Sequence, residues 1–172
     1  MSQKRVLIID DETNMRHMLE VMLGRAGYEV VSAHNGEDAI QRLSSADPHF
    51  ILCDIKMPRM NGMEFLKKAR EIHPEKTYIM MSAYGTLETA LDAMKQGAYD
   101  YISKPFKKDE VLLTLKKAEE RERLKEENVA LRDRISRIEE KYSFGNIIAR
   151  SEAMANVFDL VRKVADHRPR CS

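Results

Sequence analysis

Residues 50–62 read FILCDIKMPRMNG, in which an apolar run ends at the carboxylate Asp54 and a loop containing Pro, Asn and Gly follows. An apolar run of this length between turn residues is typical of a strand buried on both faces, as in a parallel sheet. Open α/β sheets place their ligand sites at the carboxyl ends of such strands. Asp also commonly begins turns, so these residues alone leave both readings of Asp54 open.

The segments on either side of this run alternate between short apolar strands and amphipathic helices. The predicted strands cover residues 4–10, 28–33, 50–54, 77–82 and 98–103. Strands alternating with helices form right-handed βαβ units around a parallel sheet covered on both faces. Residues 1–120 are therefore predicted to form a doubly wound five-stranded α/β domain. The flavodoxin-like strand order 2-1-3-4-5 is the expectation for a fold of this class.

The first predicted helix illustrates how its boundaries are placed. Thr13 can cap its amino end, and Gly27 is a plausible stop. Its expected inward face consists of Met15, Met18, Leu19, Met22 and Leu23, which follow helical spacing. The later helices are expected over residues 63–72 and 86–96, and a long helix is expected from about Lys108.

Residues 116–142 are densely charged and contain no Gly or Pro. Their apolar seam steps by four, three, four, three and four residues through Leu124, Asn128, Leu131, Ile135, Ile138 and Tyr142. This is the a/d pattern of a coiled coil, and it is too narrow to face a globular core. Asn128 falls at an a position, where one polar residue fixes register and favours two strands. A dimeric coiled-coil linker is expected, and a single solvated helix is the alternative.

The composition narrows the class of protein and of partner. The chain has 172 residues, of which 43% are hydrophobic and 33% charged, with 29 basic and 28 acidic side chains and a net charge of +1. Bulk charge therefore demands neither a nucleic-acid nor an anionic-membrane partner. The sequence shows no signal segment or membrane-length apolar run, and its two cysteines, Cys53 and Cys171, form no disulfide framework. We expect a cytoplasmic protein.

Five polar residues fall at the carboxyl ends of the predicted strands: Asp10, Asp11, Asp54, Ser82 and Lys104. The ends of parallel strands converge on one edge of a sheet. Carboxylates about 4 Å apart repel by about 4 kcal/mol per pair at an effective dielectric near 20. Such a cluster must take up a proton or hold a cation, and an all-oxygen site that keeps water ligands suits Mg²⁺.

Together these groups have the chemistry of phosphoryl transfer. Asp54 can act as a carboxylate nucleophile, and the hydroxyl of Ser82 can donate to an anion. Lys104 adds a positive charge that is suited to an anion rather than to neutralising the carboxylates alone. Each residue also has a simpler reading, as a helix cap, a turn residue or a solvated charge. Because all five lie at the carboxyl ends of their strands, we favour a phosphoryl-transfer site in which Asp54 is the phosphoryl acceptor.

Over about residues 4–120 the sequence resembles the receiver domain of two-component response regulators. The matching segments are Val6–Glu12, Asp54–Pro58 with Asn61-Gly62, Ser82-Ala83 and Lys104–Phe106. The resemblance implies that Asp54 accepts a phosphoryl group from a sensor histidine kinase. It also implies that Mg²⁺ is held by Asp11, Asp54 and the backbone carbonyl of Lys56, with Asp10 acting through the water shell of the metal.

The same resemblance assigns roles to three further residues. Lys104 would pair with the acyl phosphate, and its bond to Pro105 is expected to be cis. Ser82 stands where many members have threonine, and it would move toward the phosphoryl group. Tyr101 matches the switch aromatic that turns inward when Ser82 moves. Lys56 and Tyr84 match variable positions that tune the phosphoryl lifetime, so that lifetime is not predicted here.

Residues 144–154 are similar to the entry into the AAA+ domain of NtrC-type activators of sigma-54 polymerase. No G-x-x-x-x-G-K-[ST] loop follows in this chain. The expected organisation is a receiver domain at 1–120, a linker helix at 116–142 continuous with it, and the truncated start of an ATPase domain at 143–172. In a full-length protein the partners would include sigma-54 RNA polymerase and DNA.

The expected function is a phosphorylation switch rather than an enzyme. Phosphorylation of Asp54 would change a dimer face made by the fourth helix, fifth strand and fifth helix, and through it the linker. Two alternatives remain at this stage. One is a dimeric coiled-coil adaptor with a receiver-like domain. The other is a flavodoxin-like phosphohydrolase, whose dehalogenase type would need an aspartate where Lys56 stands.

Overall fold

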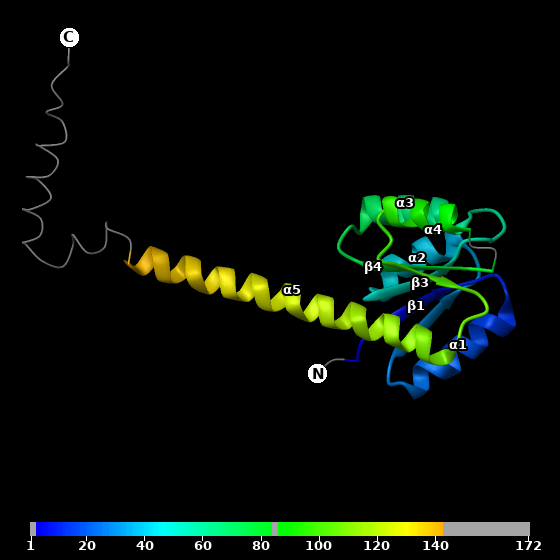
Figure 1. Ribbon diagram of the computed structural model, residues 1–172, viewed down its shortest axis with the longest axis horizontal. Helices are drawn as coiled ribbons and strands as arrows, with labels where there is room; N and C mark the ends of the chain where they lie inside the picture. Colours follow the sequence, from blue (N-terminus) through cyan, green and yellow to red (C-terminus); the bar gives the residue numbers. More distant parts are fainter. Residues whose placement is uncertain (1–2, 84–85, 143–172) are drawn as a thin grey trace, which may run out of the picture. The chain divides into compact units, whose positions relative to one another are not determined.

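The fold was analysed in a computed structural model, which describes residues 3–83 and 86–142. Five parallel strands form one sheet in the order β2-β1-β3-β4-β5 (Figure 1), which confirms the predicted topology. The strands are β1 (Arg5–Ile9), β2 (Glu29–Ala33), β3 (Phe50–Asp54), β4 (Thr77–Ser82) and β5 (Asp100–Ser103). The helices are α1 (Thr13–Arg25), α2 (Gly36–Ala46), α3 (Gly62–Ile72), α4 (Leu87–Lys95) and α5 (Lys108–Tyr142).

Helices cover both faces of the sheet (Figure 1), and the core is accordingly divided into two clusters. Helices α2, α3 and α4 pack on one face and α1 and the first part of α5 on the other. Side chains of β3 alternate between them, since Ile51 and Cys53 enter the first cluster and Phe50 and Leu52 the second. Every residue of β3 and β4 is buried, which explains why these strands read as continuous apolar runs.

Helix α1 differs from the prediction in two details. Its amino-terminal cap is Glu12, which makes no side-chain capping bond, so Thr13 is the first helical residue and the predicted Thr13 cap is wrong. Met18 is 45% exposed, although the periodicity placed it inward. Leu19, Met22 and Leu23 are buried and Met15 packs partly buried against the same cluster, because a helix on a sheet needs only a narrow stripe of contact.

Strand β5 begins two residues later than predicted. Gly97, with a φ of 93°, ends α4 in the left-handed conformation. The next backbone N–H, that of Ala98, donates to Ala93 O and closes the helix instead of joining the sheet. The backbone N–H of Tyr99 already donates to Tyr78 O of β4 at 2.7 Å, and strand β5 begins at the next residue, Asp100. Ala98 serves the turn, which a propensity pattern does not distinguish from a strand.

Helix α5 is continuous from Lys108 to Tyr142. Residues up to Arg121 belong to the compact unit that contains the sheet, and a second unit begins at Glu122. The domain limits predicted from the sequence stay predictions, and the segment predicted to begin an ATPase domain lies outside the described residues. Within the described ranges, 3–83 and 86–142, no helix is both long enough and apolar enough to span a membrane.

Candidate functional site

The strand register brings the predicted site residues to one edge of the sheet. Ile9 of β1 lies opposite Cys53 of β3, so Asp10 and Asp54 follow side by side. One carboxylate oxygen from each of Asp10, Asp11 and Asp54 can be chosen so that all three lie within 4.8 Å of one another. Asp10 and Asp54 are buried whereas Asp11 is exposed. The structure thus assembles the three carboxylates that the sequence predicted to converge.

Lys104 lies between the two buried carboxylates. Its Nζ donates to Asp10 Oδ2 at 2.7 Å and lies 3.0 Å from Asp54 Oδ1. The sequence-based expectation that Lys104 would face an anion rather than neutralise carboxylates is therefore incomplete. Two buried carboxylates this close need a cation nearby, and the Lys104 ammonium supplies one. Its peptide bond to Pro105 is cis, as the resemblance implied.

Burial and charge act in opposite directions on the two members of this pair. Burial raises the pKa of Asp54, and the nearby Asp10 and Asp11 raise it further, which together outweigh the lowering effect of Lys104. Burial lowers the pKa of Lys104, but its bonds to Asp10 and Asp54 outweigh burial and hold that pKa above its ordinary value. Lys104 therefore stays charged, while the fold disfavours the ionised form of Asp54.

Asp10 is fixed by more bonds than the sequence indicated. Its Oδ1 accepts a hydrogen bond from the backbone N–H of Glu12 at 2.9 Å. Its carbonyl accepts one from Arg16 Nη1 at 2.7 Å, and Arg16 also bonds the Thr13 hydroxyl. Arg16 was not among the site residues predicted from the sequence. Its position in the first turn of α1, next to the end of β1, is the only signal that could have identified it.

The loop after β3 turns sharply so that α3 can start beside Asp54. The Asn61 side chain and Glu64 cap α3 reciprocally. The backbone N–H of Gly62 donates to Ile55 O at 2.9 Å. A Cβ on Gly62 would lie only 2.1 Å from the carbonyl oxygen of Asp54. Only glycine can occupy this position without displacing the backbone of Asp54.

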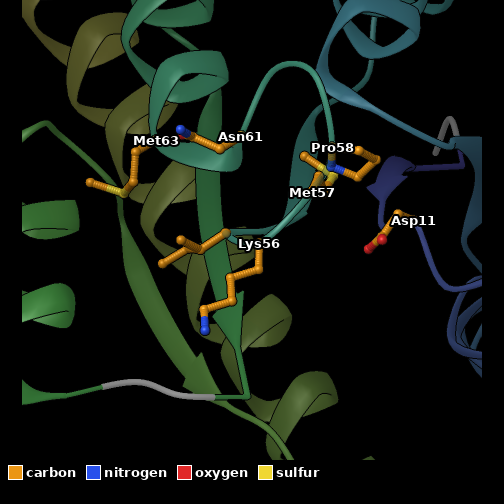
Figure 2. Close-up of a pocket in the computed structure, with 7 residues that line it drawn as sticks. Asp11, Lys56, Met57, Pro58, Asn61 and Met63 are labelled. Atoms are coloured by element: carbon orange, nitrogen blue, oxygen red, sulfur yellow. The ribbon is translucent and has the colours of Figure 1, made fainter.

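A cavity of about 550 Å³ opens beside the carboxylates. Asp11 lines it on the β1 side, and Lys56, Met57 and Pro58 line it from the loop after β3 (Figure 2). Because Asp11 belongs both to the acidic cluster and to the cavity wall, the cluster is reached from this side.

Ser82 and Tyr101, the two residues predicted to form a switch, lie in the neighbouring strands β4 and β5. Ser82 ends β4 and is buried, and its carbonyl accepts from the Lys104 N–H at 2.8 Å. Tyr101 of β5 is half-buried and packs against the core cluster on the α2–α4 face. Its hydroxyl is buried and makes no hydrogen bond to any described residue. Tyr84, the second predicted lifetime residue, lies outside the described residues.

The carboxylate ligands at this edge of the sheet fit a small divalent cation. All three candidate side chains are carboxylates, the hard oxygen ligands that Mg²⁺ prefers. With Lys104 counted, three negative charges face one positive charge, which leaves the site anionic. The thiol of Cys53 is excluded as a ligand because it is fully buried, and burial raises its pKa well above the ordinary value.

Comparison with known proteins gives one family match and many relatives. A family model described as "Response regulator receiver domain" matches residues 6–116. The regulatory protein AtoC of Escherichia coli is 35% identical over 94% of this chain and 34% of its own length. The chemotaxis protein CheY of Thermotoga maritima is 41% identical over 66% of this chain and 96% of its own.

Solved structures show the same likeness. NtrX from Brucella abortus, crystallised with ADP, aligns with a TM-score of 0.72 and 32% identity over 78% of this chain and 30% of that one. A CheY-like receiver domain protein from Methanospirillum hungatei aligns with a TM-score of 0.67 and 34% identity. It covers 71% of this chain and 98% of that one. This chain spans about a third of the length of the curated relatives AtoC and NtrC.

Proposed function

The chain belongs to the family of response regulator receiver domains, and we propose that Asp54 is its phosphoryl acceptor in a Mg²⁺-dependent reaction with a sensor histidine kinase. The family and the fold predicted from the sequence are thereby confirmed. One observation carries the assignment of Asp54. It is a buried carboxylate that contacts Lys104 at 3.0 Å within the acidic cluster, whereas both oxygens of the other buried carboxylate, Asp10, accept hydrogen bonds, from the Glu12 N–H and from Lys104.

The reaction is a displacement at phosphorus. An oxygen of Asp54 attacks the phosphoryl group of a kinase phosphohistidine, the P–N bond breaks, and a P–O bond to the carboxylate forms. The leaving imidazole nitrogen takes up a proton. Mg²⁺, held by Asp11, Asp54 and the backbone carbonyl of Lys56, with Asp10 acting through water, would offset the charge of the transferred group. The exposed Asp11 and the adjacent cavity support this choice of ligands.

Lys104 and Ser82 then bind the product. The ammonium of Lys104 lies between Asp10 and Asp54, so it can exchange its contact with Asp54 for a phosphoryl oxygen while it keeps Asp10. The hydroxyl of Ser82 donates to another phosphoryl oxygen. Because the backbones of Ser82 and Lys104 are hydrogen-bonded, a movement of one of these residues is transmitted to the other.

The readout of this switch is the surface made by α4, β5 and α5. Tyr101 repacks as Ser82 moves. This movement breaks no hydrogen bond to a described residue, because the Tyr101 hydroxyl makes none. This surface carries four exposed apolar side chains, Leu87, Leu91 and Met94 of α4 and Leu113 of α5. Exposed apolar side chains fit a homodimer contact that phosphorylation rearranges.

The second contact of the homodimer is the linker, through the seam of α5 beyond Arg121. In the whole protein the linker would control an ATPase domain that acts on sigma-54 RNA polymerase at DNA, by analogy with NtrC-type relatives. Residues 6–116 themselves act as a switch rather than as an enzyme, apart from self-phosphorylation from small donors and loss of the phosphoryl group. An adaptor without phosphorylation is the competing function.

Intact mass spectrometry tests the acceptor. The protein is incubated with acetyl phosphate and Mg²⁺, with an EDTA sample as control, and compared with Asp54→Ala. We expect one labile phosphoryl addition in the Mg²⁺ sample of the wild type and none in the variant. An addition of equal size in Asp54→Ala would contradict the assignment. A wild type that gains no mass would instead favour the adaptor.

Light scattering tests the linker dimer separately. The full chain is compared with a chain that ends at Arg121, the last residue of the sheet-containing unit, both without phosphorylation. A dimeric full chain and a monomeric short chain are expected. Equal association states for the two chains would remove the linker from the dimer, while leaving the phosphorylation chemistry untouched.

A further inference from the structure

Arg16 holds the short segment between β1 and α1, which carries two of the three clustered carboxylates, at two places. Its Nη1 donates to the carbonyl oxygen of Asp10 at 2.7 Å, and its Nη2 donates to the Thr13 hydroxyl at 3.2 Å. Asp11 lies between these two points in the chain. Because a guanidinium presents its N–H groups in a rigid planar fork, Arg16 holds the two ends of the segment at a fixed separation.

The bond to the Asp10 carbonyl acts directly on Asp11. This carbonyl belongs to the peptide group that joins Asp10 to Asp11, and the atoms of a peptide group lie close to one plane. A bond that fixes the carbonyl oxygen also fixes the rotation of that plane. It therefore constrains the direction in which the Asp11 side chain leaves the backbone.

Asp10 has further anchors, whereas the Asp11 side chain has none in the described part of the chain. The Asp10 N–H donates to Ala33 O at 3.3 Å. The Asp10 carboxylate accepts from the Glu12 N–H and from Lys104. The Asp11 side chain is exposed, and no hydrogen bond or ion pair joins it to another described residue. The place of Asp11 in the cluster therefore depends on its backbone.

We propose that Arg16 is a positioning residue for the divalent cation, which orients Asp11 through the peptide group that Arg16 holds. The inference rests on the proposed Mg²⁺ site and adds a residue that donates to none of the three carboxylates. Removing a group that orients metal ligands weakens metal binding by about ten- to a hundredfold. Mg²⁺ demands near-ideal octahedral geometry, whereas Ca²⁺ accepts irregular geometry. Mg²⁺ is therefore the ion that needs Asp11 to be fixed.

The charge of Arg16 acts in the opposite direction from its geometry. A guanidinium close to the acidic cluster repels a divalent cation, so charge alone predicts that binding tightens when Arg16 is removed. Positioning predicts that binding weakens. A residue that only stabilises the start of α1 would change the free energy of unfolding and leave the Kd of the folded protein unchanged. The direction of the change in Kd separates these three roles.

Isothermal titration calorimetry of the full 172-residue chain, with Mg²⁺ and without a phosphoryl donor, tests the proposal. Arg16→Met keeps the apolar stem and removes every donor, so its Kd for Mg²⁺ should rise about tenfold or more. Its Kd for Ca²⁺ should rise by a smaller factor. Arg16→Lys keeps the charge but replaces the fork with one ammonium, so its Kd for Mg²⁺ should rise, but less than in Arg16→Met.

Two further variants complete the comparison. Arg25→Met replaces the exposed last residue of α1 and changes the net charge by the same amount, so it should leave the Kd for both ions unchanged. Thr13→Val removes the second acceptor of Arg16 while it keeps the branched shape. Its Kd for Mg²⁺ should rise less than that of Arg16→Met, and it tests the proposal even if Arg16→Met does not fold. Urea unfolding in EDTA checks that each variant is folded.

The outcomes separate the positioning role from the proposed function. Mg²⁺ binding by folded Arg16→Met that is as tight as in the wild type, or tighter, would overturn the positioning role and leave the metal site in place. An unchanged Kd in Thr13→Val together with full affinity in Arg16→Lys would do the same. A wild type that binds no Mg²⁺ would overturn the metal site and the positioning role together.

Discussion

At the residue scale, the candidate site is held together by charges that the fold buries at a cost. Asp10 and Asp54 are both nearly inaccessible to solvent, and Lys104 bonds to both. Burial raises the pKa of Asp54, so the folded protein stabilises the neutral form of this side chain relative to the ionised form. An ionised Asp54 at neutral pH therefore works against folding in the absence of a divalent cation.

Replacing Asp54 by Asn should stabilise the protein when divalent cations are removed. The expected gain in the free energy of unfolding in EDTA is about 1 kcal/mol, because the raised pKa of Asp54 means that its ionised form is less favourable in the folded than in the unfolded protein. Mg²⁺ binds the folded wild type and so stabilises it by mass action. The difference should therefore shrink or reverse in Mg²⁺.

Urea unfolding in EDTA and in Mg²⁺ measures both effects. Glu20→Gln in α1 is the control. The difference in free energy of unfolding between this variant and the wild type should be the same in EDTA and in Mg²⁺. A wild type that is more stable than Asp54→Asn in EDTA would contradict the account of buried charge. An Asp54→Asn protein that gains as much from Mg²⁺ as the wild type would argue against Asp54 as a ligand.

At the scale of single elements, two glycines in helices show how position decides the role of a residue. Gly62 begins α3, and a Cβ on this residue would lie only 2.1 Å from the carbonyl oxygen of Asp54. Gly24 lies in α1, and a Cβ there would meet nothing within 4 Å. The first glycine is required by a close approach, and the second only adds backbone freedom to the unfolded chain.

Alanine at these two positions should have opposite effects. Gly62→Ala forces backbone displacement and should lower the free energy of unfolding by about 1–3 kcal/mol or more. Gly24→Ala should raise it by about 0.4–1 kcal/mol. Denaturant unfolding of the two variants gives the comparison. A Gly62→Ala protein as stable as the wild type would show that α3 does not need to lie so close to Asp54.

The first turn of helix α2 contains polar residues whose contribution to the free energy of unfolding depends on pH. Asn35 caps the helix and accepts from the N–H of Asp38. Burial raises the pKa of Asp38, but hydrogen bonds from Arg42 and His34 outweigh burial and hold the pKa below its ordinary value. A carboxyl with a lowered folded pKa stabilises the fold above its unfolded pKa, and the stabilisation is lost as pH falls through the folded value.

Asp38→Asn should therefore destabilise the protein at pH 7 and lose this effect in acid. We expect a loss of about 1 kcal/mol at neutral pH, and almost none at about pH 2, below the ordinary range of aspartate pKa values. Urea unfolding at the two pH values measures it, with the exposed Asp133→Asn as the control. A loss of the same size at both pH values would rule out the charged hydrogen bonds as its cause.

At the scale of the whole molecule, the order of strands and the position of the site follow from a few sequence patterns. Strands β3 and β4 can be recognised in the sequence as continuous apolar runs, because both strands are buried along their whole length. Parallel strands end on the same edge, so the convergence of Asp10, Asp54 and Lys104 could be predicted without coordinates.

Other features depended on three-dimensional approach and could not be predicted. The bond from Lys104 to both carboxylates depends on the path of the chain between β5 and α5, which no spacing rule fixes. The contact of Arg16 with Asp10 and the approach of Gly62 to Asp54 join segments whose distance is set by packing. Helical periodicity also overestimated the buried face of α1 at Met18, because amphipathic spacing does not give the width of the contact.

The central claim is that the phosphoryl group is carried by the side chain of Asp54. Borohydride reduces an aspartyl phosphate to homoserine, so the position of the homoserine can be located by peptide mass spectrometry. After treatment with acetyl phosphate and Mg²⁺, we predict homoserine at position 54 in the wild type and no homoserine when EDTA replaces Mg²⁺. Homoserine at position 10 or 11, or none at all in a protein that has gained a phosphoryl group, would contradict the account.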